Sequence, residues 1–185
     1  MKKTIFSTIL LALFFGLAAC GGGEEAAESN EAAEVTIDDG VRTIEIIGTD
    51  DMKFVVREAA EGVITSGQAG QYMLLQSIEA APGEELRISL STVSNLPPTA
   101  MSHNFALLDL GTDLDAFIRA AITARDNDYI SPEFEGQVIV ATAMVGNGAS
   151  DTITFTVPET PGEYDFICSF PGHFAGGMVG KLIVQ

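Results

Sequence analysis

Three residues whose side chains bind soft metal ions are evenly spaced near the C-terminal end of the sequence. Cys168, His173 and Met178 stand with four residues between each pair, in the segment YDFICSFPGHFAGGMVGKLIV. The pattern predicts a strand that ends at Cys168, a tight turn at Pro171-Gly172 and a second strand that Met178 opens. A thiolate, an imidazole and a thioether would therefore share one loop, at fixed distances from one another.

The only other histidine, His103, lies far upstream at the start of the apolar segment HNFALL. If a β-sandwich brings the two segments together, they supply two histidines, one cysteine and one methionine. Two imidazoles and a thiolate in a trigonal array, with a long and weak axial thioether, are the donor set of blue-copper electron-transfer sites. Zinc is the alternative metal, because it binds cysteine and histidine well, although it has little use for methionine.

The residue inventory excludes several other functions. The chain has 185 residues, two histidines, two cysteines and a net charge of −17. One chain cannot supply a three-histidine zinc centre or a trinuclear copper cluster, and the acidic balance argues against nucleic-acid binding. A nucleophilic Cys168 with His173 or His103 as base is the enzymatic alternative. That scheme assigns no role to Met178, and the sequence has no recognisable third residue that would orient the base. We therefore predict that the chain is not an enzyme.

The first twenty residues predict export. Lys2 and Lys3 precede an apolar run over 4–19, which is shorter than a typical membrane-spanning helix. The sequence LAAC that ends at Cys20 resembles a bacterial lipobox, in which this cysteine is acylated and becomes the mature N-terminus. An ordinary signal peptide or an uncleaved anchor is the alternative. Residues 21–42, rich in glutamate at their start, predict a flexible acidic tether. We therefore expect an exported protein, lipid-anchored to a bacterial membrane and facing the periplasm or the cell surface.

The rest of the chain, residues 43–185, predicts one domain of short strands. Leu114, Phe117, Ile118 and Ala121 recur at helical spacing, so we expect one short α-helix near 113–124, capped by Thr112 or Asp113. Many short strands with one inserted helix predict an all-β sandwich. The strands are expected at 43–47, 52–56, 72–78, 85–91, 103–108, 137–143, 151–157, 163–168 and 179–184.

Several segments resemble the cupredoxins, in particular the azurins and auracyanins of that family. CSFPGH at 168–173 is similar to the CTFPGH motif that both groups share, and NLPPTAMSHN at 95–104 resembles the stretch around the first copper histidine of azurins. GTDDMKF at 48–54 and DNDY at 126–129 are also similar to azurins. The four residues between His173 and Met178 match auracyanins, whereas azurins have three. Over residues 43–185, the resemblance implies an eight-stranded Greek-key β-sandwich that binds one copper ion.

The resemblance also implies a role for individual residues. His103, Cys168 and His173 would be equatorial copper ligands and Met178 the axial one. Azurins have a second weak axial contact from a glycine carbonyl, and because Ser102 stands at that position here, four- and five-coordinate sites both stay open. Asn104 and Ser169 are expected to brace the two ligand segments through hydrogen bonds. Redox partners would dock on a patch beside His173 that comprises Phe174, Ala175, Gly176, Gly177, Pro97 and Met101; core packing is the alternative for Phe174.

The function expected from these features is a mononuclear blue-copper protein that shuttles single electrons between membrane or periplasmic partners. Loss of residues 1–20 would leave 7 basic and 26 acidic residues, a net charge of −19. This charge favours partners with a basic docking face, such as c-type cytochromes, oxidases or quinol-oxidising complexes. The alternative function is that of a copper-delivery or copper-storage lipoprotein.

Overall fold

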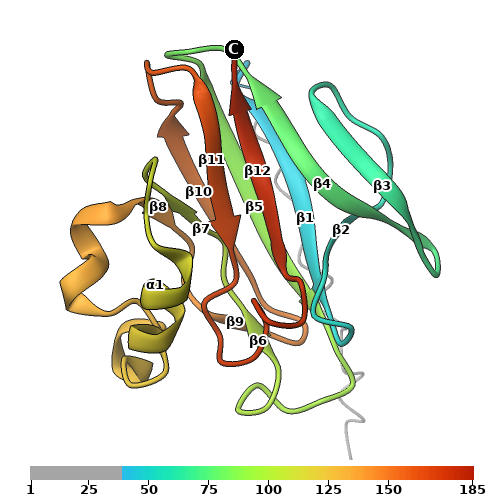
Figure 1. Ribbon diagram of the computed structural model, residues 1–185. Helices are drawn as coiled ribbons and strands as arrows, with labels where there is room; N and C mark the ends of the chain where they lie inside the picture. The colour runs from blue at the N-terminus through green and yellow to red at the C-terminus, as the bar shows by residue number, and fades with distance from the viewer. Residues whose placement is uncertain (1–38) are drawn as a thin grey trace, which may run out of the picture. The chain divides into compact units, whose positions relative to one another are not determined.

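The computed structural model describes residues 39–185, which form an all-β domain with one short inserted helix (Figure 1). The predicted fold class is therefore confirmed. The predicted signal segment 1–20, the lipobox Cys20 and residues 21–38 of the predicted tether lie outside the described residues. Among the residues that are described, no helix has the length and apolar character needed to cross a membrane.

The strands are short, and the structure divides them into twelve segments within residues 39–185, rather than eight. They are β1 (Arg42–Thr49), β2 (Phe54–Val56), β3 (Val63–Ala69), β4 (Tyr72–Ala80), β5 (Glu85–Val93), β6 (Ser102–His103), β7 (Ala106–Leu108), β8 (Val138–Ala141), β9 (Val145–Gly146), β10 (Ser150–Thr156), β11 (Gly162–Ile167) and β12 (Val179–Val184).

Ten of these strands form one curled sheet in the order β10-β5-β1-β2-β4-β12-β11-β7-β8, with β3 paired to the outer side of β4. The pairs β1–β5 and β4–β12 are parallel and the others are antiparallel. Strands β10 and β8, at the two ends of this order, approach each other, so the sheet nearly closes around its core. The short pair β6–β9 stands apart from this sheet, near one end of the sandwich.

Buried and exposed side chains alternate along the strands, so the sheet has one face that packs inside the sandwich. In β5, Leu86, Ile88 and Leu90 are fully buried, and the residues between them are partly exposed. Inside the sandwich, the rings of Phe105 and Phe166 stack with centroids 4.9 Å apart. Burial of each large apolar side chain of this kind contributes roughly 1.5–3 kcal/mol. The main core extends from these rings to the end of the sandwich where β6 and β9 lie.

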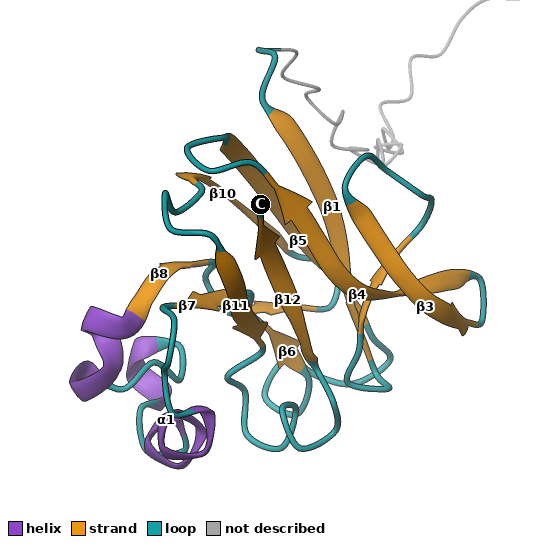
Figure 2. Cartoon of the chain, turned by 45° about the horizontal axis from the view of Figure 1, so that its top comes forward, coloured by secondary structure: helices purple, strands orange, loops and turns teal. Residues whose placement is uncertain are grey.

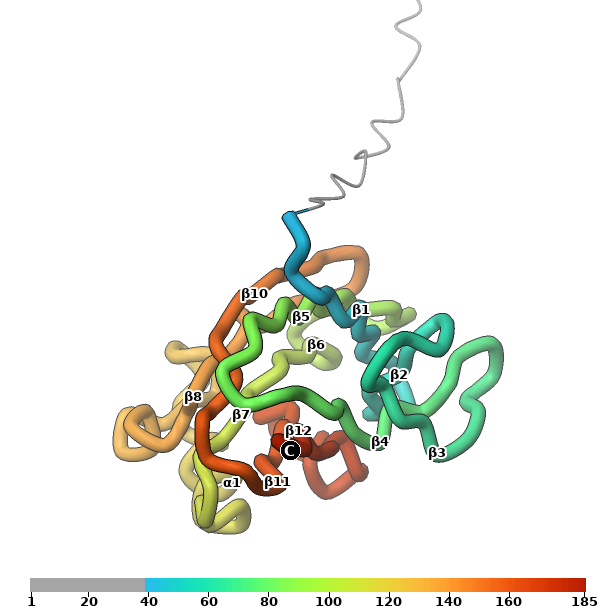
Figure 3. The backbone as a smooth tube through the Cα atoms, turned by 90° about the horizontal axis from the view of Figure 1, so that it is seen from above, coloured from blue at the N-terminus to red at the C-terminus, as the bar shows by residue number. Residues whose placement is uncertain are grey.

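The inserted helix α1 (Leu114–Ala121) covers a smaller, second core cluster. The Asp113 side chain accepts a hydrogen bond from the Ala116 amide at 3.0 Å, which confirms Asp113 as the N-cap. Phe117 packs against Leu108 and Ile167, on the side of the sheet formed by β7 and β11. Two 3-10 turns follow the helix, η1 (Arg125–Asn127) and η2 (Pro132–Gln137). Figure 2 shows these helical segments on one side of the domain, and Figure 3 shows the β3–β4 hairpin on the opposite side.

Three local features differ from the sequence-based expectation. Strand β3 was not predicted, because its sequence VITSGQA does not alternate apolar and polar residues, and it pairs only with β4, through register shifts. The predicted strand 103–108 divides into β6 and β7, because the backbone of Phe105 leaves the ladder to exchange hydrogen bonds with Thr142. The predicted strand 52–56 begins only at Phe54, since Met52 has a left-handed backbone conformation, with φ of 55°.

Candidate metal centre

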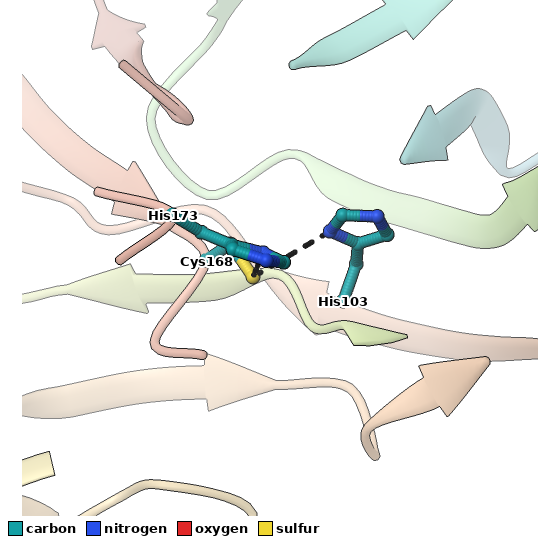
Figure 4. Close-up of side chains that lie close together, drawn as sticks. All are labelled: His103, Cys168 and His173. Carbon is teal, nitrogen blue, oxygen red and sulfur yellow. Dashed lines mark hydrogen bonds between the residues drawn. The ribbon is translucent and has the colours of Figure 1, made fainter. Parts of the chain in front are cut away.

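The fold brings His103, Cys168 and His173 together at the end of the sandwich where β6 and β9 pair (Figure 4). Their candidate donor atoms all lie within 4.8 Å of one another. The Cys168 Sγ atom lies 3.4 Å from His173 Nδ1 and 3.9 Å from His103 Nδ1. All three side chains are buried, with exposed fractions of 0% for His103 and Cys168 and 2% for His173.

Strand pairing explains this convergence. Strand β11 pairs with β7, and Ile167 stands opposite Ala106, so Cys168 lies next to the segment that follows His103. Strand β11 also pairs with β12, and the Cys168 amide donates to the Met178 carbonyl at 3.2 Å. Met178 is fully buried and belongs to the same core cluster as Cys168. The ladder of β7, β11 and β12 therefore places Cys168 beside Met178 and beside the segment that follows His103.

The separations between the donor atoms fit a single metal ion. With metal–nitrogen bonds of about 2.0 Å and metal–sulfur bonds of about 2.3 Å, donors at 120° around one ion lie ~3.7 Å apart. The observed 3.4 Å and 3.9 Å separations, for His173 and His103 respectively, bracket this value. The other nitrogen of the His103 ring, Nε2, is buried and has no hydrogen-bond partner among residues 39–185. It is thus Nδ1 of His103 that is directed at the thiol.

Burial makes the three side chains uncharged in the metal-free protein. Removal from water lowers the pKa of His173 to about 4, and the same effect, together with the neighbouring His173, lowers the pKa of His103 to about 3. Burial raises the pKa of the Cys168 thiol to about 12. Neutral imidazoles are the form that binds metals, and a bound cation favours ionisation of a neighbouring thiol. The pocket is thus suited to neutral nitrogen ligands and requires a cation to stabilise its thiolate.

A network of hydrogen bonds connects the two segments that carry the donors. The Asn104 amide group donates to Ser169 Oγ at 2.8 Å, and its oxygen accepts from the Ser169 backbone amide at 2.9 Å. The Asp128 carbonyl accepts from both Asn104 Nδ2 and Ser169 Oγ, at 3.2 and 3.1 Å. Asp128 and Tyr129 both have positive φ, 48° and 58°. Asn104 and Ser169 therefore pair as expected, whereas the contribution of Asp128 was missed, because a backbone carbonyl carries no signal in the residue type.

The residues predicted to form a docking patch differ in their exposure. Pro97, Ala175 and Gly177 are exposed and Gly176 is half-buried. Met101 is only 7% exposed. The segments that carry these residues, 94–101 and 169–178, lie at the same end of the sandwich (Figures 1 and 2).

Two further apolar residues lie on these segments. The half-buried side chain of Phe174 packs on the cluster beneath α1, so part of this predicted docking residue faces inward. Leu96, in the segment NLPP, is 45% exposed and adds an apolar side chain that is not among the predicted docking residues. The exposed apolar surface thus extends further along residues 95–100 than predicted.

Buried cysteine and histidine side chains at one end of an antiparallel-rich β-sandwich define a class of single-site metal-binding proteins. The sequence matches the family of copper binding proteins, plastocyanin/azurin family, over residues 29–185. The chain therefore belongs to the plastocyanin/azurin family, and copper is its cofactor.

Individual relatives agree with this assignment. The chain is 32% identical to azurin from Achromobacter denitrificans over 123 residues, which cover 65% of this chain and 82% of that azurin. It is 32% identical to outer membrane protein H.8 from Neisseria meningitidis over 100 residues, 54% of this chain and 53% of that protein. Reduced auracyanin from the photosynthetic bacterium Roseiflexus castenholzii aligns with a TM-score of 0.58 and 28% identity, covering 77% of this chain and 96% of auracyanin. The predicted resemblance to azurins and auracyanins is confirmed.

Proposed function

We propose that this chain is a mononuclear type 1 copper protein that carries single electrons between redox partners and has no enzymatic activity. His103, Cys168 and His173 would be the equatorial ligands and Met178 the axial ligand. When bound, copper supplies a one-electron Cu(I)/Cu(II) couple at this site. The observation that carries the proposal is the convergence of two imidazoles and a thiol within 4.8 Å in a buried site.

The residues of this chain suit electron transfer because they hold the donors still and keep water away. The three donors are almost completely buried, and Met178 is 0% exposed. Asn104 and Ser169 connect the segment of His103 to the segment of Cys168 by direct hydrogen bonds. Such bonds orient ligands and keep their geometry constant. Ser102, whose carbonyl is the candidate second axial contact, is also buried, on β6 beside His103.

The visible absorption spectrum and the electron paramagnetic resonance spectrum of the purified chain with one equivalent of Cu(II) test this function. We expect an intense thiolate-to-copper charge-transfer absorption and a narrow hyperfine splitting, and Cys168→Ala should lose both while its copper-free form stays folded. A colourless complex, or a chain that passes its copper to an acceptor rather than cycling with a redox partner, would instead support the delivery or storage alternative.

For the docking surface, we propose the apolar residues beside His173 at the same end of the sandwich. His173 itself is 2% exposed and is flanked by exposed Gly172 and Ala175. Small residues at this position allow close approach of a partner, and an apolar patch of modest size suits a brief complex. Replacement of Ala175 by Glu should slow electron exchange with a partner without changing the visible spectrum.

We further propose that the chain is exported and anchored through lipid on Cys20, with redox proteins such as c-type cytochromes as partners. One relative is named as an outer membrane protein, and the predicted lipobox precedes an acidic segment. Cys20→Ala should move the protein from the membrane fraction to the soluble fraction. A net charge of −19 after loss of residues 1–20 should attract a basic partner, so the association rate should fall as ionic strength rises.

A further inference from the structure

The end of β1 and the turn that leads to β2, together residues 48–53, contact both segments that carry the donor residues. Gly48 lies against the ring of His103, where a Cβ atom on residue 48 would approach His103 Cγ to 2.5 Å. At the other end of the turn, the Lys53 ammonium group donates a hydrogen bond to the Gly176 carbonyl, two residues before Met178. The turn is therefore in a position to fix one segment relative to the other.

Two glycines of the His173–Met178 segment leave the space that the side chains of Lys53 and Met52 occupy. A Cβ atom on Gly177 would lie 2.8 Å from Lys53 Nζ, and one on Gly176 would lie 2.9 Å from Met52 Sδ. Met52 reaches this position with a φ of 55°, a left-handed conformation that is unfavourable for a residue with a Cβ atom. Two glycines on one side and a strained residue on the other allow the two backbones to approach this closely.

The side chains of the segment that Lys53 contacts, residues 173–178, anchor it to the core only at its two ends. Its N-terminal end is anchored by Phe174, which packs beneath α1, and its C-terminal end by buried Met178. Between them, Ala175, Gly176 and Gly177 provide no large side chain, and glycine leaves the backbone free to take many conformations. The amides of Gly176, Gly177 and Met178 donate to the carbonyls of Gly172, Phe174 and His173, so these backbone bonds lie within the loop 172–178 and do not attach it to the β1–β2 turn.

We infer that Lys53 is a positioning residue for the metal centre: its ammonium group holds residues 175–177 and so fixes Met178 relative to Cys168 and His173. This inference rests on the proposed copper function. A hydrogen bond from a charged donor is stronger than a neutral one. Lys53 is the one lysine or arginine in the sequence of segments 48–54, 94–104, 142–148 and 168–178, so no neighbouring cation in these segments can replace it.

Three variants of the purified chain test this role. Lys53→Met removes the ammonium group and keeps a long apolar side chain, while Lys53→Arg keeps the charge and a donor. Lys181→Met is the matched control, because it removes the same charge from β12, where Lys181 pairs with Asp165 at 2.8 Å. Two properties are measured: amide hydrogen exchange of Gly177 and Met178 in the copper-free chain, and the charge-transfer spectrum after Cu(II) addition.

For Lys53→Met, we expect exchange at Gly177 and Met178 to rise about tenfold, which corresponds to one charge-assisted hydrogen bond. The relative intensities of its charge-transfer bands should also change. Lys53→Arg should restore most of both properties, and Lys181→Met should match the wild type in both. The inference fails if Lys53→Met leaves the spectrum unchanged, whether or not exchange rises, because the contact would then support the fold without positioning the ligands. It also fails if Lys181→Met changes the spectrum equally, since overall charge would then be the cause. Absence of any charge-transfer band in the wild type would instead refute the proposed copper function.

Discussion

Replacement of Asn104 by alanine tests whether the hydrogen bonds between the donor segments hold the metal-free site together. Asn104 is fully buried, and its side chain makes three hydrogen-bond contacts with Ser169, at 2.8, 2.9 and 3.2 Å, and one with the Asp128 carbonyl at 3.2 Å. The substitution removes all four and leaves the Ser169 backbone amide without this partner. Each bond contributes about 1 kcal/mol, and a buried unpaired amide costs roughly 1–3 kcal/mol.

The net loss of stability is smaller than the sum of these terms. The variant has no asparagine amide group to remove from water on folding, and this saving offsets part of the lost hydrogen bonding. We therefore expect Asn104→Ala to lose about 3 kcal/mol of unfolding free energy. For a domain of this size, that corresponds to a fall in Tm of roughly 6–12 °C. The assay is thermal unfolding of the copper-free chain followed by circular dichroism, since bound copper would stabilise the native state independently.

Asn147→Ala is the matched control. Asn147 is exposed and its side-chain oxygen accepts a single hydrogen bond, from the Ser94 amide at 3.0 Å. Its loss should cost at most about 1 kcal/mol. A double-mutant cycle with Ser169→Ala should show a coupling energy of about 1–2 kcal/mol with Asn104→Ala. If Asn104→Ala lowers the Tm no more than Asn147→Ala does, or if the cycle shows no coupling, the two donor segments are not held by this network.

Three further substitutions test the scaffold. The Arg42 guanidinium lowers the pKa of Glu84, so this ion pair stabilises the fold above the ordinary pKa of 4.5 and its contribution is lost as the pH falls through the lowered value. Glu84→Gln should therefore show a smaller drop in Tm on acidification below pH 4.5 than the wild type, and an equal drop would contradict this. Asp113→Ala removes the N-cap of α1 and should cost about 1 kcal/mol in urea unfolding. Tyr164→Phe removes the 2.8 Å hydrogen bond to the Thr160 carbonyl and should also cost about 1 kcal/mol, with no change in the visible spectrum of the copper form.

The features that could be predicted from the sequence are those that depend on residue type and local period. Strand β5 and helix α1 were predicted because their buried side chains recur every two and every three to four residues. The donor set was predicted because the chain has just two histidines and one cysteine outside the lipobox, which leaves few combinations. In each case, the signal lies in the side chains themselves.

The features that were not predicted depend on backbone atoms or on contacts between distant segments. The Asp128 carbonyl binds Asn104 and Ser169 only because two successive residues take left-handed conformations. Gly48 is needed because the His103 ring occupies the space of a side chain, and neither residue indicates this by itself. Nothing in the sequence distinguishes Lys53 from an ordinary surface lysine. Its contact with Gly176 joins residues 123 positions apart and becomes visible only in the folded chain.

The aromatic core helps to set the distance between the two segments that carry the donor atoms. Phe105 follows His103 by two residues and Phe166 precedes Cys168 by two, and their rings stack 4.9 Å apart. Both rings are buried and belong to the cluster that also contains Cys168. The spacing of the two donor segments is therefore set by the contact between these rings and by the β7–β11 ladder. Because burial of such side chains is worth several kcal/mol in any metal state, the same packing would oppose displacement of the ligands when the charge of a bound ion changes.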